Sequence, residues 1–148
     1  MIAGVGLALR GWAAGTIQKN EALTIVGPYA YTRNPLYLGS FLIGLGVTLT
    51  SGGWLWPGLF VGLFVVLYSR AIGIEDARLE ELFGDAFRVY RSHVPRLLPR
   101  LTPHRLDDPG DKGFSWARYR RNREWEAALG FVAAAVLLTA KWWWTATA

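Results

Sequence analysis

Residues 36–69 read LYLGSFLIGLGVTLTSGGWLWPGLFVGLFVVLYS, two apolar runs separated by three small residues. The separator, residues 51–53, is a turn signal too short for anything but a tight connection. Each run, 36–50 and 54–69, is slightly shorter than the roughly 17–25 residues that usually span a bilayer. Trp54 and Trp56 beside the turn are typical of a membrane interface. The stretch therefore predicts a membrane hairpin whose two helices each just reach across.

Two further apolar segments, 1–16 and 127–145, flank this hairpin. Arg10 interrupts the first one, which favours a helix that starts within the membrane over a signal peptide. The whole chain is 52% hydrophobic over 148 residues, against roughly 45–50% in a typical soluble domain. We expect an all-α integral membrane protein, folded as one domain over 1–148.

The composition also excludes several kinds of site. The chain has no cysteine, which removes disulfides, thiolate metal sites and a cysteine nucleophile. Its two histidines, His93 and His104, make a histidine-based metal cluster improbable. No metal is expected.

The net charge of +5 is distributed around the apolar segments. Apart from Arg10 and Lys141, every Lys and Arg lies in 17–35 or 70–125. The positive-inside rule places both of these segments in the cytoplasm and the 51–53 turn on the far side. We expect an inner-membrane protein of a bacterium, with both termini outside. A soluble nucleic-acid binder is the competing interpretation, and detergent-free solubility would distinguish it.

Residues 70–100, which follow the hairpin, show the periodicity of an amphipathic helix. Gly84 interrupts this pattern, and Pro95 and Pro99 end it. The expected apolar face consists of Ile74, Leu79, Leu82, Phe83, Phe87 and Tyr90. We interpret Phe87 and Tyr90 as packing residues, with a cavity wall as the alternative.

The hairpin should bring two polar sets together. Its first arm is preceded by Arg33-Asn34-Pro35, and its second arm is followed by Glu75-Asp76. Because a short turn makes the arms antiparallel neighbours, these sets should be close in space and form a charged pocket at the membrane surface. The alternative is structural, since arginines at helix ends are common anchors and ion pairs there are usually structural.

A longer pattern extends across this region. It comprises Gly27-Pro28-Tyr29, then Arg33 to Gly39 (RNPLYLG), Glu75, Leu79, Phe83-Gly84, Phe87, Tyr90, Val94-Pro95-Arg96 and Pro99. In order and spacing it resembles the isoprenylcysteine carboxyl methyltransferase family and the wider group of membrane methyltransferases that includes phospholipid N-methyltransferases. The resemblance covers roughly residues 18–100.

The resemblance implies S-adenosylmethionine bound at the cytosolic face above the hairpin. It implies a cofactor site in 18–39 and 70–100 made of Gln18, Glu21, Ala22, Leu23, Thr24, Tyr29, Asn34, Pro35, Leu36, Tyr37 and Glu75. The activity that it implies is methyl transfer to a lipid or lipid-modified acceptor, either a carboxylate or an amine. The catalytic candidates are Arg33 and Arg70, which could orient an anionic acceptor, and Glu75.

Three positions depart from the family pattern. Asn34 and Glu21 stand where histidine is frequent, and asparagine hydrogen-bonds but does not titrate near neutral pH. Ala71 stands where carboxyl methyltransferases carry a substrate-binding arginine, with Arg70 beside it. These departures leave the acceptor open, and a non-catalytic membrane protein that keeps the scaffold for lipid or partner binding is the alternative function. The sequence does not predict the oligomeric state.

Two features fall outside the pattern. The basic run 117–126 (ARYRRNREWE) could bind anionic headgroups or simply anchor the last helix, and its Asn122, Arg123 and Glu126 could instead reach the site. His93, at a helix end, is either a surface residue or a general base.

Overall fold

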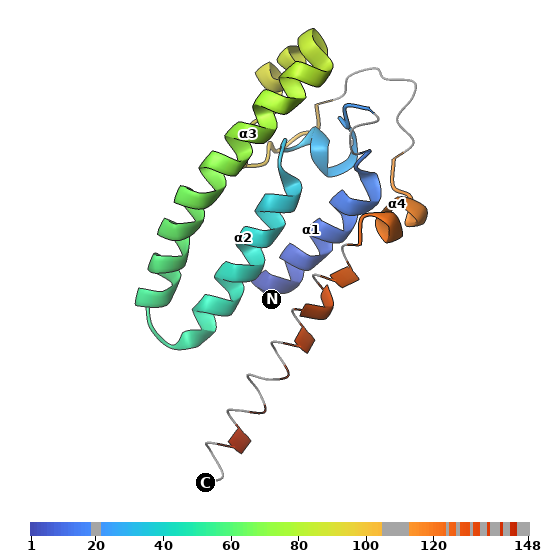
Figure 1. Cartoon of the computed structure of the whole chain (residues 1–148). Helices are drawn as coiled ribbons and strands as arrows, with labels where there is room; N and C mark the ends of the chain where they lie inside the picture. The colour runs from blue at the N-terminus through green and yellow to red at the C-terminus, as the bar shows by residue number, and fades with distance from the viewer. Residues whose placement is uncertain are drawn as a thin grey trace.

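A computed structural model describes residues 1–18, 22–104 and 113–123 and part of 125–144. Its elements are all helical: α1 (Ile2–Thr16), the 3-10 turn η1 (Gly27–Ala30), α2 (Pro35–Thr48), the 3-10 turn η2 (Leu49–Ser51), α3 (Leu55–His93) and α4 (Trp116–Arg121). No strand occurs among the described residues, so the all-α prediction is confirmed. In Figure 1 helices α1, α2 and α3 run side by side, with α2 between the other two. The last apolar segment, 127–145, lies largely outside the described residues.

Helices α1 and α2 pack backbone against backbone. A Cβ atom placed on Gly6 would lie 2.6 Å from the carbonyl oxygen of Gly39, and one on Gly46 would lie 2.6 Å from the amide nitrogen of Ala3. These pairings run in opposite chain directions, so the helices are antiparallel and α1 begins beside the hairpin tip. Small residues permit this close approach, as they do where helices associate in membranes.

Helices α2 and α3 form the predicted hairpin. Gly52, with φ 78°, takes the left-handed conformation that closes the turn and that favours glycine. Between the arms lies a set of aromatic rings in contact, the aromatic column. The ring centroids of Tyr68 and Phe64 are 4.0 Å apart, and those of Phe64 and Phe41 are 4.9 Å apart. The remaining members are Tyr37 and Phe60.

Helix α3 is longer than the sequence pattern indicated. The second hairpin arm and the amphipathic segment form one helix of 39 residues. Its backbone breaks at Gly84 (φ 52°, ψ −122°), as predicted, and it ends at His93 before Pro95. The prediction that Pro95 ends the helix is confirmed, whereas the expected extent of the segment to residue 100 was wrong, because the residue before a proline is driven out of the helical region.

The apolar face of the 70–100 segment is narrower than predicted. Phe87 and Tyr90 are buried and form a core with Ile25 and Val94, against which Leu79 and Phe83 pack. In contrast, Ile74 is 73% exposed and Leu82 50% exposed, so these two were wrongly assigned to the buried face. No described element covers them.

One described helix, α3, is long and apolar enough to cross a membrane by length and composition. Its apolar stretch carries exposed side chains such as Leu59, Leu63 and Val66. Helix α1 has 15 residues and α2 has 14, both below the usual spanning length of about 17. A contiguous apolar surface of this kind marks a lipid-facing or partner-facing region.

Residues 94–104 form a strap that returns from the end of α3 to residues 27–34, the signature loop. The amide of Arg33 donates to the carbonyl of Pro95 (2.9 Å), and the amide of Arg100 donates to the carbonyl of Tyr31 (2.9 Å). The hydroxyl of Thr32 donates to the carbonyl of Leu97 (3.0 Å). The strap therefore satisfies loop groups that would otherwise be buried without partners.

Helix α4 closes the end of α1. The amide of Ser115 donates to the carbonyl of Gly15 (2.7 Å), and the Asn122 side chain donates to the carbonyl of Ala14 (2.7 Å). Arg118 also donates to Gly15. Helix C-termini leave carbonyls without partners and favour positive charge, which accounts for an arginine-rich turn here.

Candidate functional site

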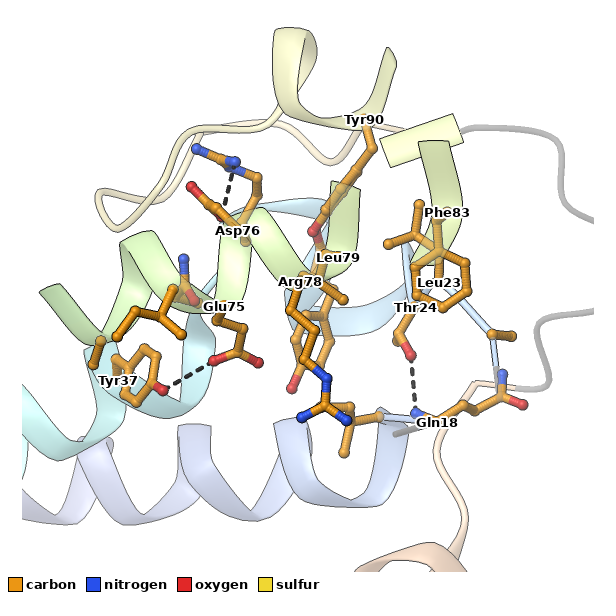
Figure 2. A pocket seen from close by; sticks show the side chains of 17 residues that line it. Gln18, Leu23, Thr24, Tyr37, Glu75, Asp76, Arg78, Leu79, Phe83 and Tyr90 are labelled. Carbon is orange, nitrogen blue, oxygen red and sulfur yellow. Dashed lines mark hydrogen bonds and ion pairs between the residues drawn. The ribbon is translucent and has the colours of Figure 1, made fainter. Parts of the chain in front are cut away.

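A half-enclosed cavity of about 530 Å³, the first cavity, lies above the hairpin where α1 ends, the signature loop begins and α3 leaves the apolar region. Its volume is within the roughly 300–1,000 Å³ of typical small-molecule sites. Figure 2 shows its lining: Ile17, Gln18, Ala22, Leu23, Thr24, Tyr29, Arg33, Asn34, Tyr37, Ala71, Ile74, Glu75, Asp76, Arg78, Leu79, Phe83 and Tyr90. The wall combines carboxylates with aromatic and aliphatic surfaces.

Glu75 is held in this wall by α2. The Tyr37 hydroxyl donates a hydrogen bond of 2.9 Å to Oε2 of Glu75, as Figure 2 shows. Because Tyr37 lies in the first turn of α2 and Glu75 lies on α3, this contact joins the two arms of the hairpin beside the predicted polar sets. The other carboxylate oxygen of Glu75 takes no part in this hydrogen bond.

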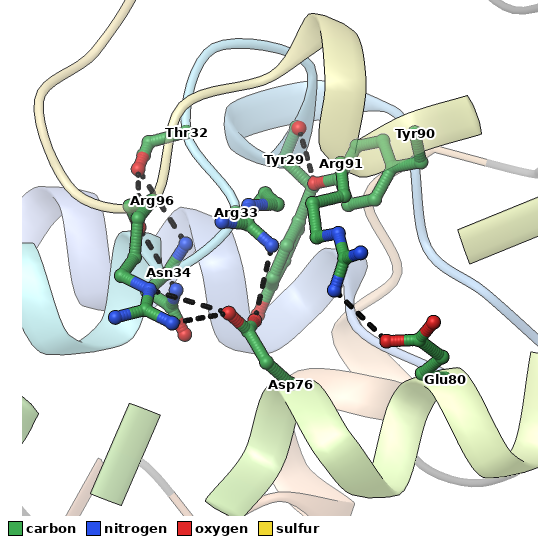
Figure 3. Close-up of polar contacts among 9 residues, drawn as sticks. All are labelled: Tyr29, Thr32, Arg33, Asn34, Asp76, Glu80, Tyr90, Arg91 and Arg96. Carbon is green, nitrogen blue, oxygen red and sulfur yellow. Dashed lines mark hydrogen bonds and ion pairs between the residues drawn. The ribbon is translucent and has the colours of Figure 1, made fainter. Parts of the chain in front are cut away.

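Asp76, the neighbour of Glu75, organises the rest of the polar set (Figure 3). Its Oδ1 accepts from Arg33 (3.1 Å), and its Oδ2 accepts from Arg96 of the strap (2.9 Å). The Arg33 and Asp76 side chains are 9% and 10% exposed. A buried carboxylate between two guanidiniums is well satisfied, and removing it would leave charge without a partner.

Arg33 is packed as well as paired. Its guanidinium lies 5.8 Å from the centre of the Phe87 ring, a cation–π distance. Burial lowers the pKa of Arg33, with Asp76 acting in the opposite direction. Its Nε is buried and has no hydrogen-bond partner among the described residues. One donor on this side chain is therefore available to a bound molecule.

Asn34 holds the strap by a hydrogen bond. Its side-chain amide donates to the Arg96 carbonyl at 2.8 Å (Figure 3). This bond needs a fixed amide donor and no titratable group. The Asn34 side chain also lines the first cavity.

Most predicted cofactor residues gather around the first cavity. Its lining includes Gln18, Ala22, Leu23, Thr24, Tyr29, Asn34, Tyr37 and Glu75. The backbone amide of Gln18 donates to the Thr24 hydroxyl (2.9 Å), which links the chain just after α1 to the residues before the signature loop. Glu21 lies outside the described residues.

A second cavity of about 300 Å³ adjoins the first and reaches toward the apolar ends of the helices. Six residues line both: Ile17, Tyr29, Arg33, Asn34, Tyr37 and Glu75. The second alone is lined by Arg10, Ser40 and Tyr68, along with the predicted residues Pro35 and Leu36. Arg10 hydrogen-bonds Ser40 and the Leu36 carbonyl.

Several predicted residues lie away from both cavities. Arg70 is exposed on α3 and lines neither cavity, whereas Ala71 beside it lines the first. His93 is exposed and its ring stacks on that of His104, 4.4 Å away. In the basic run, Arg123 pairs with Glu126 and Asn122 caps α1.

Two residues of the site were not among the predicted cofactor-binding and catalytic residues. Asp76 was seen as part of a carboxylate pair, but its link to Arg96 depends on the strap, which no local pattern shows. Tyr90 both packs in the core and lines the first cavity, and its hydroxyl donates to the Tyr29 carbonyl (2.7 Å). Burial raises the pKa of Tyr90, so its phenol remains a donor.

The fold and the site define an all-helical protein with a small-molecule cavity at the end of an apolar hairpin. The chain belongs to the phospholipid methyltransferase family, whose model matches residues 5–86. This span includes the hairpin, the signature loop and Glu75, so the resemblance noted in the sequence is confirmed.

Three relatives illustrate the range of the family. The chain is 36% identical to Protein-S-isoprenylcysteine O-methyltransferase of Schizosaccharomyces pombe over 83 residues, covering 56% of this chain and 35% of the relative. It is 33% identical over 106 residues to the cobalt-zinc-cadmium resistance protein CzcN of Cupriavidus metallidurans (69% and 49%). It is 31% identical over 71 residues to Methanethiol S-methyltransferase 1 of Bradyrhizobium diazoefficiens (48% and 24%).

The chain thus spans half or less of the length of these relatives. No solved structure matches it.

Proposed function

We propose that the protein transfers a methyl group from S-adenosylmethionine to a lipid or another amphiphile that partitions into the bilayer. Membership of the family supports methyl transfer as the reaction. The observation that carries the proposal is Glu75, a carboxylate held by Tyr37 in the wall of a cavity large enough for a nucleoside-sized molecule. Bound at this wall, a cationic ligand would be close to an acceptor arriving from the membrane.

The residues of the first cavity fit this cofactor chemically. Glu75 supplies the charge that an ammonium group or ribose hydroxyls require. Leu23, Leu79 and Phe83 supply an apolar surface for a flat base. We assign the rest of the predicted set, including Gln18, Glu21, Ala22 and Thr24, to the segment that runs along the cofactor.

When bound, S-adenosylmethionine supplies a methyl carbon that an acceptor lone pair takes in line, as the carbon–sulfur bond breaks and its electrons remain on sulfur. Such a displacement depends on proximity and alignment. Alignment is what the Arg33–Asp76–Arg96 contacts provide, since they fix the signature loop against α3. A carboxylate acceptor needs no proton transfer, whereas an amine loses one to water or to a carboxylate.

Arg33 is the better placed of the two catalytic arginines. It lines both cavities, and its buried Nε has no partner among the described residues. We propose that this donor orients the acceptor. Arg70, exposed and outside both linings, would act only as an anchor at the membrane surface.

The membrane setting is also a proposal. The exposed apolar surface of α3 and the basic residues around the first cavity favour insertion of the hairpin, with the cavity on the positive-inside face. For a bacterial chain, this is the cytoplasmic face of the inner membrane. An apolar acceptor is already concentrated there.

Cofactor binding provides the test. Purified protein in detergent should bind S-adenosylmethionine in calorimetry, and Glu75→Ala should abolish the binding. Glu81→Ala is the matched control, because Glu81 is an exposed glutamate of the same helix outside both cavities. Wild-type protein that releases no heat at millimolar cofactor would favour the alternative, a non-catalytic membrane protein that retains the scaffold.

The acceptor can then be sought directly. Labelled cofactor incubated with a host lipid extract should give a labelled product in the presence of wild-type protein. The same extract with Glu75→Ala should give none.

A further inference from the structure

The second cavity differs in character from the first. It lies on the membrane side of the shared wall formed by Tyr37 and Glu75. At about 300 Å³, it is at the lower end of the range for small-molecule sites. If the cofactor occupies the first cavity, as proposed above, an acceptor in the second would face it across this wall.

One way out of the second cavity, between α1 and α2, is closed by backbone. A Cβ atom placed on Gly39 would lie 2.8 Å from the carbonyl oxygen of Gly6 and 2.6 Å from Cγ of Arg10. The Arg10 side chain crosses Gly39 and ends in hydrogen bonds to Ser40 and Leu36. A hydrocarbon chain has no room along this seam.

The route between α2 and α3 is closed by the aromatic column. Tyr68, in the cavity wall, contacts Tyr37 edge to face at 5.2 Å and stacks on Phe64 at 4.0 Å. Behind them Phe64 contacts Phe41 (4.9 Å) and Phe60 (5.8 Å). Phe64 is 5% exposed, so the column fills the space between the arms.

We propose that the second cavity is the acceptor subsite and that Tyr68 and Phe64 limit the acceptor to a small amphiphile with a short apolar chain. The polar end of such a molecule meets Arg10, Ser40 and the Tyr37–Glu75 pair. Its apolar end stops against Tyr68. This inference rests on the proposed methyl transfer and narrows its acceptor from lipids in general to compact molecules.

The test uses three acceptor classes, n-alkylamines, n-alkanethiols and n-alkanoic acids, each as propyl, octyl and hexadecyl members. Turnover is measured with labelled cofactor, and binding of each probe to cofactor-free protein is measured by calorimetry. Wild-type protein should bind and methylate the short members of at least one class and discriminate against the hexadecyl member by about tenfold or more.

Shortening the column should remove this discrimination. Phe64→Ala should raise the ratio of hexadecyl to propyl turnover at least about tenfold relative to wild type. Phe64→Leu should raise this ratio less, because leucine preserves more of the packing. Leu63→Ala is the matched control, because Leu63 precedes Phe64 but is 55% exposed. Comparing ratios between variants cancels the partitioning of long probes into micelles.

The outcomes separate the two proposals. Absence of cofactor binding by wild-type protein contradicts the proposed function and this inference together. Two outcomes overturn the inference alone: equal methyl transfer to short and long probes, or a hexadecyl-to-propyl turnover ratio that both Phe64 variants leave unchanged. In either case the alkyl chain of the probe lies along an outer face of the helices. Cofactor binding without turnover of any probe also overturns it.

Discussion

Tyr37 donates a hydrogen bond of 2.9 Å to Glu75, and this bond joins the first residues of α2 to the middle of α3 at the wall shared by both cavities. It holds the one carboxylate that we assign to the cofactor, in an orientation that the hairpin itself determines. The site is therefore as rigid as the packing of the two arms.

Replacing Tyr37 with phenylalanine should weaken cofactor binding while the ring contact with Tyr68 remains. A hydrogen bond to a charged group contributes roughly 1.5–3 kcal/mol, so the dissociation constant in calorimetry should rise about tenfold or more. Tyr31→Phe serves as the control, because Tyr31 lies outside both cavities. Equal affinities for wild type and Tyr37→Phe would show that Glu75 needs no such support.

Replacing Asp76 with alanine should destabilise the fold. Breaking a buried pair costs about 3–5 kcal/mol, since the remaining charge has no partner. The comparison is Glu80→Ala. Glu80 also accepts from two arginines, Arg88 and Arg91, but their side chains are 60% and 45% exposed. Exposed pairs of this kind contribute about 0–1 kcal/mol to stability. Denaturant unfolding in micelles, followed by circular dichroism, should rank the two variants in this order. Similar losses would contradict it.

Replacing Arg33 with alanine should lower turnover more than it lowers cofactor affinity, because its free Nε faces the acceptor in our proposal. We expect turnover to fall by about tenfold to a hundredfold, the range of a lost charge-assisted hydrogen bond. Arg91→Ala is the control, since Arg91 lies over the same Phe87 ring at 6.0 Å but is more exposed. An unchanged rate for Arg33→Ala would remove Arg33 from the catalytic set.

The strap should loosen in mild acid. Burial, and after it the charges of His93 and Arg100, lower the pKa of His104 from about 6.5 in an unfolded chain. The unfolded chain then binds the proton more readily, so the stability present above about pH 6.5 is lost as pH falls toward the folded pKa. Protection factors of the strap amides, from which the intrinsic pH dependence of exchange has been removed, should fall below that pH. In His104→Gln these protection factors should stay constant over the same pH range, and a fall of equal size would contradict the assignment.

Replacing Gly39 with alanine should force α1 and α2 apart. The added Cβ would overlap the Gly6 carbonyl and the Arg10 stem, and such overpacking costs about 1–3 kcal/mol. Gly62→Ala, on α3, meets nothing within 4 Å and should be neutral or slightly stabilising, because alanine is the better helix former. Thermal unfolding of both variants measures the difference, and equal midpoints would refute tight packing at this seam.

Much of this arrangement could be predicted from the sequence because it depends on local patterns. The two apolar runs and the turn at residues 51–53 gave the hairpin, and the hairpin alone placed Arg33 and its neighbours near Glu75 and Asp76. The Arg33–Asp76 ion pair of 3.1 Å confirms that proximity, whereas the bond of Tyr37 to Glu75 was not predicted.

The remainder depends on contacts that no local pattern encodes. The change from apolar to charged residues near Arg70 indicated a boundary, yet a helix continues through a change of medium when its backbone hydrogen bonds do. Similarly, Pro95 and Pro99 showed where α3 stops but not that the strap turns back to the signature loop.

The pairing of the strap with the signature loop also has a consequence for biogenesis. Thr32 and its partner Leu97 are separated by 65 positions in the chain, and the whole hairpin is synthesised between them. The loop therefore leaves the ribosome long before the segment that supplies its hydrogen bonds. The signature loop is therefore fixed against the strap only after both arms have been made, which in the proposed membrane setting couples assembly of the site to completed insertion of the hairpin.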